Sequence, residues 1–159
     1  MKTMQQWFDE YGDSHQNVFN EIIHWICVPV IFLTIVGLLS LIPFPSFSQN
    51  STALAEFLHF GTLLLLIGMI FYIRLSLTMS AGILIVSLLV LFLVKIINIY
   101  FAQHAWIVYL LAFAAAWVGQ FIGHSIEGKK PSFFKDLQFL MVGPGWLLSH
   151  IYQRLGIKL

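Results

Sequence analysis

Four of the six histidines in this sequence lie beside long apolar segments: His15, His24, His124 and His150. An imidazole near hydrocarbon is costly unless it has a partner, and several imidazoles in one place indicate a shared partner. Imidazole nitrogen is a preferred ligand of iron, zinc, copper and nickel. The histidines therefore predict a metal site. Iron with open coordination positions permits oxygen chemistry and zinc permits hydrolysis, and the spacing is compatible with both.

Polar residues before the first apolar segment follow helical spacing. Asn17, Asn20 and His24 are separated by three and four residues, which places them on one face of a helix. Asp13 or Ser14 is expected to cap this helix and to leave His15 in its first turn. Since residues nine apart lie on opposite sides of a straight helix, His15 joins His24 at one ion only if the backbone bends or His15 lies in a non-helical cap.

A second polar stripe ends the last long apolar segment. Gln120, His124 and Glu127 are spaced by four and three residues and share one helix face. Together with Asn17 and Asn20, the side chains of Gln120 and Glu127 can hold the second ring nitrogens of the histidines in a fixed tautomer.

Structural roles are the alternative for each histidine. His24 with Asn20 can form an interhelical hydrogen bond, and His15 can be a solvated cap residue. His124 with Glu127 can be interfacial. His59 and His104 fall on the opposite side under the topology below, so we expect both to be interfacial.

The elements that must position these residues are membrane helices. Apolar residues make up 59% of the 159 positions and charged residues 9%, and the mean hydropathy is +0.87. A soluble domain has about 25% charged residues. The composition predicts an integral membrane protein.

Four apolar segments are long enough to cross about 30 Å of hydrocarbon as helices. They cover residues 25–42, 57–73, 81–100 and 105–123. Short connections favour antiparallel neighbours, so we predict an all-α, four-helix membrane bundle in a single domain. The segment before the first span is expected to be an interfacial helix. Residues 137–151, which contain Gly143, Pro144 and Gly145, are expected to be interfacial or re-entrant.

The loop charges predict the orientation. Basic residues precede the first span, lie between the second and third, and follow the fourth: Lys2, Arg74, Lys129, Lys130, Lys135, Arg154 and Lys158. Both termini are therefore expected to be cytoplasmic. A secretory signal is not expected, because the first residues are acidic. A bacterial inner membrane and an endoplasmic reticulum membrane fit equally well. The net charge of +1 gives no reason to expect nucleic acid as a partner.

Two motifs carry a resemblance to a known family. Residues 15–24 (HQNVFNEIIH), followed by Val28-Pro29, resemble the opening motif of the Mpo-type 2-hydroxy fatty acid dioxygenases. Residues 120–131 (QFIGHSIEGKKP) and Gly143-Pro144 resemble the C-terminal signature of that family, in the same order and across nearly the whole chain. Cys27 departs from the pattern, where glycine is expected before the Val-Pro pair.

The resemblance implies an iron(II)-dependent enzyme of fatty acid α-oxidation that shortens a 2-hydroxy long-chain fatty acid by one carbon. The implied partners are this acid, O₂ and membrane lipid, and the implied products are the shorter acid, CO₂ and water. This equation balances without outside electrons, so neither a reductase nor a nicotinamide site is implied.

The corresponding hypothesis places iron(II) on His15, His24 and His124, with His150 as a further ligand. The substrate's carboxylate and α-hydroxyl bind the metal while its acyl tail lies among the spans. Asn20 and Glu127 are the expected catalytic residues, where Glu127 orients His124 or accepts the hydroxyl proton. Lys129 or Lys130 is expected to steer the carboxylate headgroup.

Other classes remain open from the sequence. A haem protein can use two of the histidines as axial ligands between helices. A di-iron desaturase is less favoured because the chain has no adjacent histidine pair. A transporter is disfavoured by the lack of an inverted repeat. A non-enzymatic membrane assembly factor would show no substrate-dependent O₂ consumption.

Overall fold

The computed structural model describes residues 2–42, 57–128 and 139–158, and these residues contain helices and no strand. The all-α class is therefore confirmed for the described part of the chain. The helices are α1 (Met4–Gly12), α2 (Val18–Ser40), α3 (Phe60–Leu75), α4 (Leu77–Phe101), the short 3₁₀ helix η2 (Ala102–His104), α5 (Ala105–Glu127) and α7 (Gly143–Arg154).

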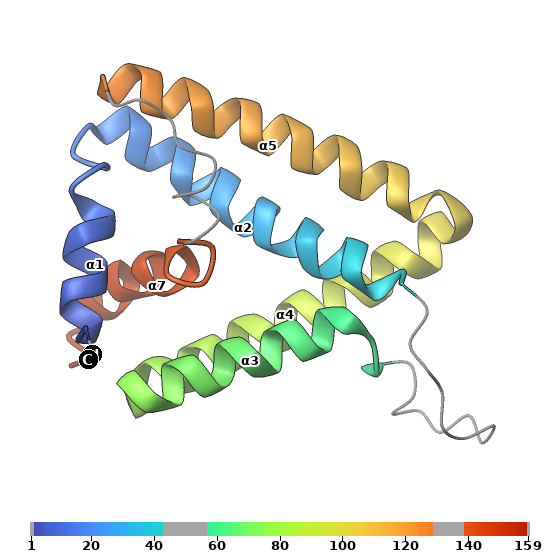
Figure 1. Ribbon diagram of the computed structural model, residues 1–159, viewed down its shortest axis with the longest axis horizontal. Coiled ribbons are helices and arrows are strands. Elements are labelled where there is room, and N and C mark those ends of the chain that lie inside the picture. Colours follow the sequence, from blue (N-terminus) through green and yellow to red (C-terminus); the bar gives the residue numbers. More distant parts are fainter. Residues whose placement is uncertain (1, 43–56, 129–138, 159) are drawn as a thin grey trace.

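Two helix pairs and a pair of terminal helices make up the arrangement (Figure 1). Helix α2 packs along α5, α3 packs along α4, and α2 also contacts α3 and α4. Helices α1 and α7 lie together across one end of these pairs, beside the start of α2. This end contains the polar residues that the sequence singles out.

Small residues on α5 allow α2 to approach closely. A Cβ atom on Gly119 would lie 2.6 Å from Sγ of Cys27, and one on Gly123 would overlap the side-chain oxygen of Asn20. Glycine at these positions removes the side chains that would keep the two backbones apart. The close approach brings the histidine-bearing faces of α2 and α5 together.

The start of α2 differs from the prediction. The helix begins at Val18, and the side chain of Asn17 accepts a hydrogen bond from the backbone N–H of Phe19 at 2.9 Å. Asn17 is therefore the N-cap, and the prediction of a cap at Asp13 or Ser14 is wrong. Because α1 ends at Gly12, His15 lies in the connection between two helices. The non-helical placement that a shared ion requires is thus present.

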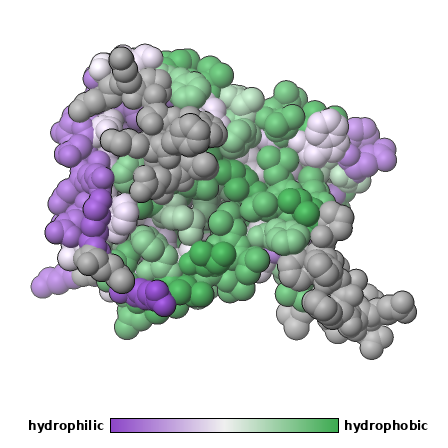
Figure 2. Space-filling view, in the orientation of Figure 1, coloured by the Kyte–Doolittle hydropathy of each residue, from purple (hydrophilic) through white to green (hydrophobic). Residues whose placement is uncertain are grey.

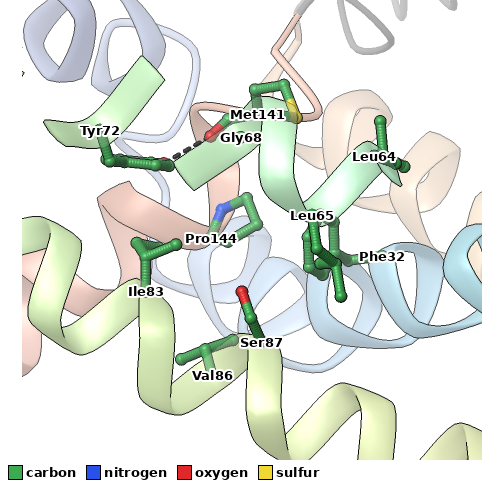
Figure 3. A pocket seen from close by; sticks show the side chains of 10 residues that line it. All are labelled: Phe32, Leu64, Leu65, Gly68, Tyr72, Ile83, Val86, Ser87, Met141 and Pro144. Atoms are coloured by element: carbon green, nitrogen blue, oxygen red, sulfur yellow. Dashed lines mark hydrogen bonds between the residues drawn. The ribbon is translucent and has the colours of Figure 1, made fainter. Parts of the chain in front are cut away.

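Helix α7 docks on α3 through a tyrosine and a glycine. The hydroxyl of Tyr72 donates a hydrogen bond to the carbonyl of Met141, and Figure 3 shows this contact at the edge of a small apolar pocket. A Cβ atom on Gly145 would overlap the Tyr72 ring, so glycine is needed for this approach. Pro144 occupies the first turn of α7, where proline is tolerated. The Gly-Pro-Gly sequence therefore begins a helix.

Many large apolar side chains are exposed on the described helices. Figure 2 shows hydrophobic residues over much of the visible face and hydrophilic residues along α1. Helix α2 and the stretch Leu77–Glu127 are long and apolar enough to cross a membrane, whereas α3 has only 16 residues. Within the described residues, two candidate spans are thus supported, and the four-span bundle with cytoplasmic termini stays a prediction.

The turn after α4 yields the first testable prediction. Ala102 has φ 42° and ψ −118°, and it is the one non-glycine residue with positive φ among the described residues. Since glycine adopts this conformation without steric strain, Ala102→Gly should stabilise the fold by about 1 kcal/mol and raise the thermal midpoint in detergent by about 2–4 °C. The matched control is Ala114→Gly inside α5, which should lower the midpoint. An equal decrease in both variants would contradict the strain assignment.

Candidate metal centre

Three histidines from three places in the chain converge at the end of the α2–α5 pair. His15, His24 and His124 are all buried, and each offers a ring nitrogen such that the three atoms lie within 4.8 Å of one another. The ring centroids are 4.1 Å apart for His15 and His24, 5.0 Å for His24 and His124, and 5.6 Å for His15 and His124. Three imidazoles at this spacing can bind one ion.

Backbone carbonyls fix the tautomer of two of these rings. Nδ1 of His15 lies 2.6 Å from the carbonyl oxygen of Tyr11, and Nδ1 of His24 lies 2.9 Å from that of Asn20. A carbonyl oxygen only accepts, so Nδ1 carries the hydrogen in both rings. In the neutral ring the lone pair is then on Nε2, which is the arrangement of a metal-binding histidine whose other nitrogen is held by an outer partner.

Aromatic residues hold His15 in place outside a helix. Its ring stacks on Tyr11 with a centroid distance of 4.3 Å and an interplanar angle of 14°. Trp146 of α7 packs against both rings, at 5.3 Å from His15 and 5.2 Å from Tyr11. Tyr11 and Trp146 were not among the residues expected at the site. Tyr11 and Trp146 meet at His15 because α7 packs against α1. The spacing of residues within either helix does not indicate this contact.

Glu127 connects the end of α5 to the segment that carries His15. Its carboxylate accepts hydrogen bonds from the backbone N–H groups of Gln16 at 3.0 Å and Asn17 at 2.8 Å, and from the side-chain amide of Asn20 at 3.1 Å. Three N–H donors favour the ionised carboxylate. These contacts tie the end of α5 to the α1–α2 connection and to the first turn of α2. That Glu127 orients His124 or accepts the hydroxyl proton stays a prediction.

Asn20 completes this link from the other side. Its side chain is fully buried, and its amide also donates to the carbonyl of Ser14 at 3.0 Å. Its own backbone carbonyl accepts from His24. Asn20 and Glu127 therefore support the backbone before and within the start of α2. The catalytic role expected for both residues stays a prediction.

His150 lies apart from the three converging rings. It is half-buried on α7, its Nδ1 donates to the carbonyl of Trp146 at 2.9 Å, and its ring centroid is 4.3 Å from that of Trp146. Among the described residues, the group within mutual ligand distance comprises the other three histidines only. Lys129 and Lys130, the expected headgroup residues, lie outside the described residues. His59 caps α3, and the exposed His104 ends η2 and precedes α5; neither belongs to the group of converging rings.

The donor set fits a single first-row metal ion. Three neutral imidazoles suit iron, zinc, copper or nickel, and three protein ligands leave coordination positions for other molecules. A haem held by two histidines needs the porphyrin plane between two rings on opposite sides. Centroid separations of 4.1–5.6 Å among three buried rings leave no room for such a plane. The haem alternative is therefore disfavoured.

Comparison with known protein families agrees with the resemblance that the two sequence motifs carry. A model of the family described as 2-hydroxy-palmitic acid dioxygenase Mpo1-like matches residues 1–155. The chain belongs to this family. Searches of curated proteins and of solved structures give no match. The match to the Mpo1-like family spans all three converging histidines together with Asn20 and Glu127.

An apolar pocket adjoins the candidate metal centre of this Mpo1-like chain. Its volume is about 30 Å³, and Tyr11, which stacks on His15, forms part of its wall. The remaining lining residues are Val28, Ile31, Trp117, Gln120, Phe139, Leu140 and Gly143. The pocket lies between α2, α5 and the start of α7, so an apolar chain entering it would approach the histidines from inside the helix pair.

A glycine substitution tests how the close helix approach supports the centre. In Gly123→Ala the new Cβ would displace Asn20 and so weaken its bonds to Ser14 and Glu127. We expect a stability loss of about 1–3 kcal/mol and weaker binding of added metal. In the control Gly119→Ala the new Cβ meets Cys27 at 2.6 Å, so stability should fall without the same loss of metal affinity. Calorimetric titration with Co²⁺ measures the difference. Equal affinities in the two variants would contradict the role of Asn20.

Proposed function

We propose that this protein is an iron(II)-dependent dioxygenase that shortens 2-hydroxy fatty acids by one carbon. The observation that carries the proposal is the buried group of His15, His24 and His124 in a chain of the Mpo1-like dioxygenase family. Three neutral donors with further positions open suit an ion that must bind both a substrate and O₂.

The proposed reaction balances without a reductant. The acid R–CH(OH)–COOH and O₂ give R–COOH, CO₂ and H₂O, so the carboxyl carbon leaves as CO₂ and the α-carbon becomes the new carboxyl carbon. All electrons that reduce O₂ come from the substrate. The chain therefore needs no second redox centre, and the described residues contain one group of three metal-ligating side chains.

Iron(II) bound at this centre would supply activation of O₂ and a binding point for the 2-hydroxy acid. The residues of the chain provide the geometry. His15 and His24 present Nε2 because Nδ1 is held by a carbonyl oxygen. Glu127 fixes the backbone at Gln16 and Asn17, which keeps His15 beside the other two rings. Tyr11 and Trp146 pack against the ring of His15 and hold it in place.

A lipid substrate fits the surroundings of the centre. The apolar pocket beside Tyr11 supplies hydrophobic contacts for an acyl chain, although it would have to widen from its present volume of about 30 Å³. Exposed apolar side chains on the same end of α2 and α5 favour contact with a bilayer, among them Phe19, Ile26, Ile122 and Ile126. A fatty acid dissolved in that bilayer would reach the pocket from the lipid side.

Substrate selectivity tests the proposal. We expect detergent-purified protein reconstituted with iron(II) to consume O₂ on addition of 2-hydroxypalmitic acid and to form the acid with one carbon fewer. The 3-hydroxy isomer and palmitic acid are the controls, because neither places a hydroxyl beside the carboxylate, and both should leave O₂ consumption at background. Equal consumption with all three acids, or none with any, would overturn the proposed function.

A further inference from the structure

A polar cavity leads from the surface to the metal centre between α1 and α7. Its volume is about 440 Å³. Asp9 and Asp13 line its exposed part, whereas His15, with 8% of its surface exposed, lines its buried part. Of the three converging histidines, only His15 is a lining residue. The cavity thus ends at the wall of the centre.

The charge of the cavity selects what can enter it. Three carboxylates line it, from Asp9, Asp13 and Glu21, and none of its described lining residues is lysine or arginine. A cleft lined by one sign of charge concentrates ions of the opposite sign and repels its own. A divalent cation is therefore drawn into the cavity, while the carboxylate of a fatty acid is repelled.

Among the described residues, the other sides of the centre offer no comparable polar route. On the side of α5, the carboxylate of Glu127 is held against Gln16 and Asn17. The outer faces of α2 and α5 are apolar next to the centre, with Ile22 and Ile122 each 52% exposed. An ion loses hydration on such a surface without any compensating ligand.

His150 adds a metal-ligating group along this route. Its Nδ1–H is donated to the carbonyl of Trp146, so the lone pair of the neutral ring is on Nε2. It lines the same cavity as His15, and the ring of Trp146 contacts both histidines. The imidazole of His150 is therefore placed before His15 on a path from the surface.

We propose that this cavity is the entry route of the divalent metal ion, in which Asp9, Asp13 and Glu21 attract the ion and His150 binds it in transit to His15. The inference rests on the proposed metal centre and assigns His150 to delivery of the ion. It also separates two paths, because the ion arrives from water and the acid arrives from the lipid side.

The rate of metal uptake tests the route. Full-length protein freed of metal is mixed with Co²⁺, and the visible absorption of the bound ion is followed with time. We expect the triple variant Asp9→Asn, Asp13→Asn, Glu21→Gln to fill on the order of ten-fold more slowly at low ionic strength and to reach the parent's final absorbance. The difference should shrink as salt is added. The control is Glu10→Gln, since Glu10 of α1 is paired with Lys2, which precedes that helix, and is not a lining residue.

His150→Gln separates delivery from permanent ligation. Slower filling with the parent's final spectrum supports the transit role, whereas an altered final spectrum would make His150 a resident ligand and overturn it. Equal filling rates in the parent and the triple variant would overturn the entry route while leaving the metal centre intact. A parent protein that binds no Co²⁺ would instead overturn the metal centre itself.

Discussion

Replacing His24 with alanine should abolish metal binding and turnover together. His24 is 1% exposed and its ring is close to both other rings, with centroid distances of 4.1 Å to His15 and 5.0 Å to His124. Its removal leaves two imidazoles, which is fewer than the three protein ligands that metal sites of this kind use. We expect metal affinity to fall by more than about 100-fold, beyond the 10–100-fold that loss of an outer partner costs. Iron content and O₂ consumption of the purified variant measure the effect.

His124→Ala should give the same result, because the two residues act on one ion and losses within one unit do not add. His104→Ala is the matched control, since His104 is exposed and lies at the opposite end of α5. Normal iron content with full turnover in either His24→Ala or His124→Ala would show that the three rings are packed together for structural reasons alone.

Glu127→Ala should weaken the attachment of the α1–α2 connection to α5. The substitution removes the acceptor of three hydrogen bonds, from the N–H groups of Gln16 and Asn17 and the amide of Asn20. The bond from Gln16 is exposed to water and those from Asn17 and Asn20 are partly buried, so each lost bond should cost about 0.5–1.5 kcal/mol. Because His15 lies one residue before Gln16, we expect metal affinity to fall by about 10–100-fold while the helix content is unchanged. Co²⁺ titration and far-ultraviolet circular dichroism provide the two readouts.

The conservative variant Glu127→Gln distinguishes positioning from proton transfer. The glutamine amide retains one acceptor oxygen, so the metal affinity of Glu127→Gln should lie between those of the parent and Glu127→Ala. Its turnover should be proportional to the fraction of protein that holds metal. If Glu127 were instead the base that accepts the hydroxyl proton, Glu127→Gln would bind metal normally and lose turnover. Glu10→Ala is the control for loss of an exposed carboxylate.

Local spacing in the sequence was sufficient for part of the site. Asn20 with His24 and Gln120 with His124 are each four residues apart, and the structure places all four side chains in the buried interior near the α2–α5 contact. Helical periodicity indicates such pairs because both members belong to one helix. The all-α class followed from the length of the apolar segments, which fits membrane-spanning helices.

Other features depended on contacts between distant segments. The partners of Glu127 are 107–111 residues away in the chain, and the place of Trp146 beside His15 depends on α7 docking against α3 through Tyr72. No periodic pattern contains this information. Whether His15 lies inside or outside a helix depends on where α1 ends and α2 begins. Helix boundaries are the least reliable part of a single-sequence prediction.

The departure at Cys27 is explained by its neighbour on α5. Its side chain is buried, and its Sγ occupies the space that a Cβ on Gly119 would need. A glycine at one member of the pair accommodates the larger residue at the other. The close α2–α5 packing that brings the histidines together is thereby kept.

The ratio of O₂ consumed to CO₂ and shortened acid formed tests the central claim most directly. Purified protein loaded with iron(II) is given 2-hydroxypalmitic acid with every reductant removed after loading, and all three quantities are measured over many turnovers. We predict a ratio of about 1:1:1, because the proposed equation takes all its electrons from the substrate. Turnover that stops without an added reductant, or O₂ consumption without matching CO₂, would contradict the dioxygenase assignment.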